Sequence, residues 1–106
     1  MKNLGDFMKQ AQALQQKVAD AKARLAETEV EGTAGGGMVT VRLKNVGDLI
    51  KLTIDESLLA PGEGEILADL IIAAHADAKR KLEAKQAEVM REVAGPFAGM
   101  PGMPKF

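Results

Sequence analysis

The sequence predicts an α+β fold of the order α-β-β-β-α, with a small antiparallel three-stranded sheet and two long helices. Three observations lead to this prediction. An apolar seam with helical spacing lies at each end of the chain, alternating apolar and polar residues lie between the seams, and glycine-rich or proline-rich breaks separate these segments. The chain has 106 residues, 46% of them hydrophobic and 27% charged, which is typical of one soluble domain.

The first helix is predicted over residues 4–26, where apolar residues recur three and four positions apart. Such spacing places them on one face, as in a heptad-like seam. A helix of this length extends roughly 33 Å. The seam consists of Leu4, Phe7, Ala11, Leu14, Val18, Ala21 and Leu25.

Three strands are predicted in the centre of the chain, over residues 28–33, 38–44 and 49–55. The second and third strands alternate between apolar and polar residues, so we expect a hairpin or meander with one apolar face. In the third strand the apolar side is Ile50, Leu52 and Ile54.

The run Gly35-Gly36-Gly37 separates the first two strands. A phosphate-binding loop would require a helix after the glycines and a Gly-Lys-Ser/Thr motif, and the sequence has neither. We therefore interpret the run as a turn that uses positive φ angles or a bulge.

The second helix is predicted over residues 65–93 and ends before Gly95-Pro96. Its length is roughly 43 Å. The remaining residues are rich in Gly, Pro and Met without periodicity. We expect a single domain over residues 1–94 and a flexible tail over residues 95–106.

The two helices are longer than the predicted strands, which span only about 20–25 Å. Their overhanging apolar positions would contact water unless the helices pair beyond the sheet or with a second chain. The sheet also has two bare edges that a partner could cover. We therefore expect a homodimer with two-fold symmetry. The expected dimer interface consists of Leu14, Val18, Leu25, Leu82 and Val89.

The residue inventory excludes several classes of site. There is no Cys, so disulfides, thiol chemistry and cysteine-ligated metals are excluded. His75 is the single histidine and Ser57 the single serine, which leaves no convincing catalytic triad or metal-binding cluster. We expect no enzymatic activity, cofactor, metal or small-molecule substrate. The N-terminus does not resemble a signal peptide and no stretch is apolar enough to span a membrane, so we expect a cytoplasmic protein without membrane contact.

Charge is distributed unevenly although the net charge is −1. Residues 1–26 carry a net +3, residues 27–78 a net −7 and residues 79–106 a net +3. Cations on rigid helices can produce local positive potential and contact phosphates despite a neutral total. The candidate phosphate contacts are Lys2, Lys9, Lys17, Lys22, Arg24, Lys79, Arg80, Lys81, Lys85 and Arg91.

Seven short motifs in order along the chain resemble the YbaB/EbfC family of small bacterial nucleoid-associated proteins. They are Met1–Gly5, Met8–Gln12, Val30–Val39, Ile54–Leu58, Asp69–Ile71, Ala73-Ala74 and Asp77–Lys81. One departure is Glu56, where the family often has Pro. The resemblance covers nearly the whole chain.

This resemblance implies a homodimer whose paired helices project as arms that contact double-stranded DNA. It also implies a bacterial source, a location at the nucleoid, no enzymatic activity, and a role in nucleoid organisation and gene regulation. The three Phe residues do not interleave with the basic ones, which favours duplex backbone contact over single-strand stacking. The alternative is a protein-interaction adaptor, for example in recombinational repair, with incidental DNA binding.

Overall fold

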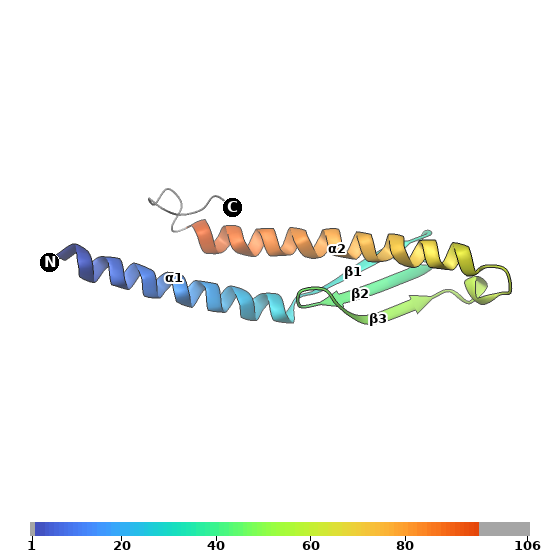
Figure 1. The fold of residues 1–106 in the computed structure, drawn as a ribbon, viewed down its shortest axis with the longest axis horizontal. Helices are drawn as coiled ribbons and strands as arrows, with labels where there is room; N and C mark the ends of the chain where they lie inside the picture. Colours follow the sequence, from blue (N-terminus) through green and yellow to red (C-terminus); the bar gives the residue numbers. More distant parts are fainter. Residues whose placement is uncertain (1, 96–106) are drawn as a thin grey trace.

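The structure is a computed structural model that describes the backbone of residues 2–95 and the side chains of residues 4–95. It has the predicted order α-β-β-β-α (Figure 1). The elements are α1 (Lys2–Glu27), β1 (Glu29–Ala34), β2 (Val39–Lys44), β3 (Asp48–Ile54), the 3-10 turn η1 (Glu56–Leu59) and α2 (Gly64–Ala94). The tail predicted over residues 95–106 lies, from residue 96 on, outside the described residues.

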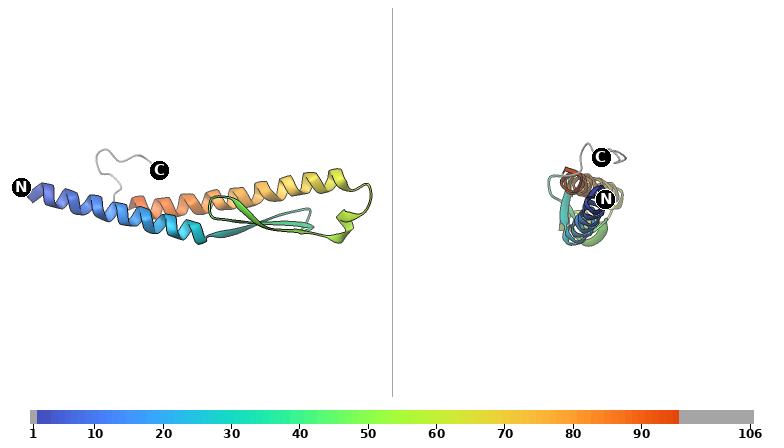
Figure 2. Two further views of the ribbon diagram at one scale, coloured as in Figure 1. Left: turned by 60° about the horizontal axis from the view of Figure 1, so that its bottom comes forward. Right: turned by 90° about the vertical axis from the view of Figure 1, so that its left-hand side faces the viewer.

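The molecule is a rod of 75 × 21 × 16 Å with a radius of gyration of 20.2 Å. A compact domain of this size would have a radius of gyration of about 13 Å. Helix α2 runs along most of the rod and lies over the sheet with its first half and beside α1 with its second half (Figures 1 and 2). The two helices project together beyond the sheet, and this projecting pair is called the arm below.

The sheet is an antiparallel meander in the order β1-β2-β3. The Gly35-Gly36-Gly37 turn joins its first two strands, with φ angles of 64°, 68° and 97°, as predicted. Pairing of β2 with β3 shifts between Arg42 and Leu43, because Arg42 pairs with Lys51 whereas Leu43 pairs with Leu49. Ile50 is therefore the extra residue of a β-bulge, and the regular alternation predicted for the third strand is interrupted.

The main core lies between α2 and the first two strands. Val39, Val41 and Leu43 of β2 are at most 1% exposed and pack with Ala74 and Ala78 of α2. These small residues let the helix approach the sheet closely. The core thus fixes α2 over β1 and β2.

Strand β3 differs from the prediction because its apolar side is largely uncovered. Leu49, Ile50 and Leu52 are 55%, 47% and 40% exposed, and Ile54 alone is half-buried against the core. Since Leu52 pairs directly with Val41, it projects from the same face of the sheet as that buried residue. A helix about 10 Å wide covers roughly two strands spaced about 4.8 Å apart, so α2 leaves the third strand exposed.

The apolar seam of α1 meets α2 within one chain from Leu14 onward, whereas Leu4 and Phe7 at its start are 62% and 64% exposed. Ala21, Val89 and Val93 are buried there. Leu14, Val18 and Leu25, three of the expected dimer-interface residues, are partly buried against them. Of the other two, Val89 is 5% exposed and packs in this seam, and Leu82 is 3% exposed and packs in the main core between α2 and the sheet. All five therefore have packing partners in their own chain.

Candidate nucleic-acid interface

The candidate phosphate contacts lie on both helices, but the structure does not bring all of them to one place. Arg80 and Lys81 lie at the level of the sheet, where Lys81 reaches β1, whereas Lys85 and Arg91 follow on the arm. The basic run 79–81 is thus at the base of the arm. The side chain of Lys2 lies outside the described residues.

Arg24 forms an ion pair across the arm. Its guanidinium donates to the Glu92 carboxylate with an N–O distance of 2.6 Å, joining α1 to α2. The hydrogen bond from Arg24 and its positive charge lower the pKa of Glu92 below its ordinary value. The pair borders an open hollow of about 270 Å³ between the helices. A phosphate that binds Arg24 must therefore compete with Glu92.

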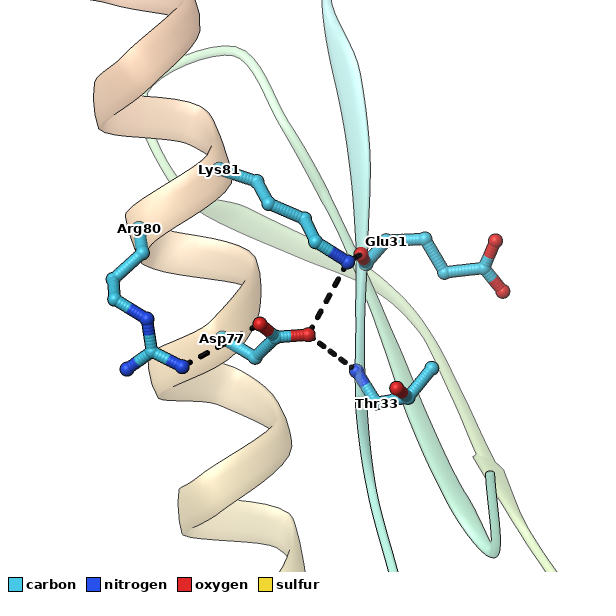
Figure 3. Close-up of polar contacts among 5 residues, drawn as sticks. All are labelled: Glu31, Thr33, Asp77, Arg80 and Lys81. Carbon is cyan, nitrogen blue, oxygen red and sulfur yellow. Dashed lines mark hydrogen bonds and ion pairs between the residues drawn. The ribbon is translucent and has the colours of Figure 1, made fainter. Parts of the chain in front are cut away.

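Arg80 and Lys81 share a carboxylate partner, Asp77 (Figure 3). Lys81 Nζ lies 3.2 Å and Arg80 Nη2 3.4 Å from the Asp77 carboxylate oxygens. The backbone N–H of Thr33 also donates to Asp77, with an N–O distance of 3.0 Å, and this bond is the main cause of a lowered pKa at Asp77. Lys81 in addition donates to the Glu31 carbonyl at 2.8 Å. Lys81 is thus held by the fold.

Six candidate cations are exposed and form no ion pair with any residue between positions 4 and 95. They are Lys9, Lys17, Lys22, Lys79, Lys85 and Arg91. Each keeps its full set of donors for an external anion. These six side chains form the available part of the predicted interface.

Spacing along α1 aligns some of its cations. Lys17 and Arg24 are seven residues apart, so they fall on one flank of the helix with roughly 10 Å between them, whereas Lys9 is turned away from Lys17 by about 80°. Lys22 lies five residues after Lys17 and points to a different side. One flank of α1 thus carries Lys17 and Arg24, of which Arg24 is paired with Glu92.

Sequence reasoning missed a second basic surface on the sheet. Arg42, Lys44 and Lys51 project from the face opposite α2, where Arg42 and Lys51 border a shallow depression together with Glu31. The alternating pattern of the second strand placed Arg42 and Lys44 on a polar face. Because residues 27–78 carry a net charge of −7, the charge distribution along the sequence did not indicate a basic surface there. Lys44 lies 3.9 Å from the Glu27 carboxylate.

Nothing in the part of the chain described here brings three or more potential metal ligands together. His75 is exposed on α2, and the Ser57 hydroxyl donates to Asp55 at 2.7 Å, where the carboxylate caps η1. Between residues 4 and 95 no helix combines the length and the apolar character needed to cross a bilayer.

Comparison with known proteins identifies the family. The model of the YbaB/EbfC DNA-binding family matches residues 1–97. A nucleoid-associated protein of Phenylobacterium zucineum is 72% identical over 106 residues, which cover 100% of this chain and 99% of that protein. One of Caulobacter sp. strain K31 is 69% identical over 102 residues, or 96% and 94% of the two chains.

The fold has a counterpart among solved structures. An uncharacterized protein of Helicobacter pylori superposes with a TM-score of 0.70 at 23% sequence identity, covering 90% of this chain and 97% of the other. This similarity supports the α-β-β-β-α arrangement. The family match and the near full-length relatives support more than the fold: this chain belongs to the YbaB/EbfC DNA-binding family.

Proposed function

We propose that this protein binds duplex DNA as a homodimer at the bacterial nucleoid, chiefly through phosphate contacts, and thereby contributes to nucleoid organisation and gene expression. It acts by binding and has no catalytic role. Support comes from the family, whose description is DNA binding, and from relatives that are described as nucleoid-associated proteins.

The observation that carries the phosphate proposal is the set of six exposed cations without an ion pair. Lys9, Lys17 and Lys22 lie on α1, and Lys79, Lys85 and Arg91 lie on the adjacent α2. Cations that neutralise phosphates release condensed counterions, so binding weakens steeply as salt rises. Phosphate contact also carries little base information, so affinity for unrelated duplexes should be similar.

The proposed homodimer uses the exposed side of β3. Because Leu14, Val18 and Leu25 already pack against α2 within one chain, we place the interface on Leu49, Ile50 and Leu52 and on the outer edge of β3. No helix or loop between residues 4 and 95 hydrogen-bonds to that edge. Pairing with β3 of a second copy would bury these apolar side chains and satisfy the backbone groups.

Fluorescence anisotropy with two unrelated duplexes over a salt series tests the phosphate contacts. One triple variant carries Lys9→Gln, Lys17→Gln and Lys22→Gln, and a second carries Gln at the three free cations of α2. Each should weaken binding at least about tenfold at low salt and flatten the salt slope. The matched control carries Gln at Arg42, Lys44 and Lys51 of the sheet, and its affinity should stay close to that of the wild type.

Other outcomes would redirect the proposal. If the sheet variant loses affinity while both helix variants keep it, DNA contacts the sheet instead. If all three variants bind as the wild type does, phosphate contact by these cations is wrong, and the adaptor function becomes the better explanation of the arm.

A further inference from the structure

An open three-stranded sheet has two edges, and each can pair with a strand of another molecule. Here the edges are β1 and β3. The two edges differ in their polar surroundings, and the difference lies in two side chains of α2, Asp77 and Lys81. These two residues are called the edge clamp below.

The edge clamp binds main-chain groups of β1 directly (Figure 3). Asp77 accepts a hydrogen bond from the Thr33 N–H at 3.0 Å, and Lys81 donates to the Glu31 carbonyl oxygen at 2.8 Å. The two side chains also pair with each other at 3.2 Å, four residues apart on one helix. One donor and one acceptor of the strand are therefore occupied.

The groups that the clamp binds point away from β2. In an antiparallel strand, the N–H and C=O of one residue share a direction, and that direction alternates along the strand. Because the Thr33 N–H reaches α2, the main-chain groups of Glu31 and Thr33 face the outer edge of β1. These are the groups that an added strand would need.

A glycine between the two bound residues lets the helix come close enough. A Cβ on Gly32 would lie 2.7 Å from Ala78 Cα, and closer still to the Ala74 carbonyl oxygen and the Ala78 nitrogen. The short Asp77 side chain reaches the strand backbone because of this approach.

The opposite edge has no such contacts. Thr33 pairs with Thr40, and Thr40 pairs with Thr53, so by the same alternation the main-chain groups of Leu52 and Ile54 point outward from β3. Between residues 4 and 95, no side chain hydrogen-bonds to them.

We propose that Asp77 and Lys81 close the β1 edge to strand addition, so that edge-to-edge association with a second copy of this chain is confined to β3. With one open edge per chain, association ends at two chains; with two open edges it continues into longer assemblies. The limit of two chains rests on the proposed homodimer, whereas closure of β1 does not.

Light scattering over a concentration series tests the clamp in the double variant Asp77→Ala/Lys81→Ala. The variant should reach an average mass about twofold that of the wild type or more, rising with concentration. Lys79→Ala/Glu83→Ala is the matched control, because it also removes one cation and one carboxylate four residues apart on α2. Its mass should equal that of the wild type.

Adding Thr33→Pro to the double variant locates the new contact. The Thr33 N–H points outward, so proline removes no bond to β2 but blocks an incoming strand. The triple variant should return to the wild-type mass. An unchanged mass of the double variant with a native circular dichroism spectrum overturns the proposal, as does a larger assembly that Thr33→Pro leaves intact.

Two further results are interpretable. If the double variant does not fold, Lys81→Met, which keeps the bond between Asp77 and Thr33, decides the matter: a mass above that of the wild type supports the clamp, and an unchanged mass overturns it. If the wild type has the mass of a single chain, the proposed homodimer is refuted. The clamp is then supported if the double variant has a larger mass than that single chain, and refuted if its mass is the same.

Discussion

Gly32 shows how a missing side chain positions a whole helix. Replacement by alanine introduces a Cβ into space occupied by the backbone of Ala74 and Ala78, and backbone cannot rotate away. We expect Gly32→Ala to destabilise the protein by about 2–4 kcal/mol, because α2 must move away from β1. Urea denaturation measures the change.

Gly5→Ala is the control for the glycine prediction. Gly5 lies in α1 with nothing within 4 Å of an added Cβ. Alanine favours a helix interior by up to about 1 kcal/mol over glycine, so this variant should be as stable as the wild type or more stable. Equal effects at the two sites would refute the steric explanation.

Asp77 gives the fold a predictable acid response. The N–H of Thr33, followed by the hydrogen bond from Lys81, lowers the pKa of Asp77 below its ordinary value of 3.8. Its stabilising contribution is therefore full above that value and is lost as pH falls through the lower pKa of the folded state. The Tm of Asp77→Asn should lie below that of the wild type near neutral pH, and the difference should shrink in acid.

Thermal unfolding followed by circular dichroism from about pH 7 to about pH 2 measures this difference. Asp69→Asn is the control, since Asp69 lies on the same helix and makes no ion pair with any residue between positions 4 and 95. A difference for Asp77→Asn that grows in acid would contradict the lowered pKa.

At the scale of elements, periodicity predicted where helices and strands form but not what covers them. The alternation of β2 correctly reports which residues share a buried face, and the seam of α1 does so from Leu14 to Leu25, while Leu4 and Phe7 are exposed. The exposure of Leu52 could not be predicted, because it depends on the width of α2 and on the bulge at Ile50. The sequence pattern also gave no sign of η1, which Asp55 caps through a local hydrogen bond.

For the candidate DNA-binding site, the sequence predicted which basic residues are present but not which of them are paired within the fold. The run Lys79-Arg80-Lys81 is visible in the sequence, yet its members have different partners: Arg80 and Lys81 contact Asp77, while Lys79 is free of ion pairs among residues 4–95. These partners depend on the close approach of α2 to β1, which Gly32 permits. The distribution of charge along the sequence does not indicate how close the helix and the strand are.

Strand β3 makes a testable element-scale prediction about the homodimer. Leu52→Lys places a charge in the proposed interface, and because Leu52 is 40% exposed, the single chain should still fold. The mass in solution should fall to that of one chain, 11.2 kDa, by analytical ultracentrifugation. Val46→Lys, in the turn before β3 and 72% exposed, should keep the wild-type mass. Dissociation by Val46→Lys alone would place the interface elsewhere.

For the whole molecule, the net charge conceals how many cations are free to act. Internal ion pairs occupy Arg24, Arg80 and Lys81, and the free cations are spread along a rod 75 Å long. A long, sparsely charged surface favours several weak phosphate contacts over one strong site. The affinity for DNA therefore depends on the competition between internal carboxylates and phosphates.

Glu92→Gln tests that competition by releasing Arg24 from its partner across the arm. The freed guanidinium lies on the same flank of α1 as Lys17, so duplex affinity should rise a few-fold at low salt, and the salt slope should steepen by up to about 1 per chain. Glu88→Gln removes the same charge from the same helix, but no ion pair among residues 4–95 involves Glu88. The two variants should therefore differ in affinity by the contribution of Arg24. If they bind equally, only the general loss of negative charge matters and Arg24 does not contact phosphate.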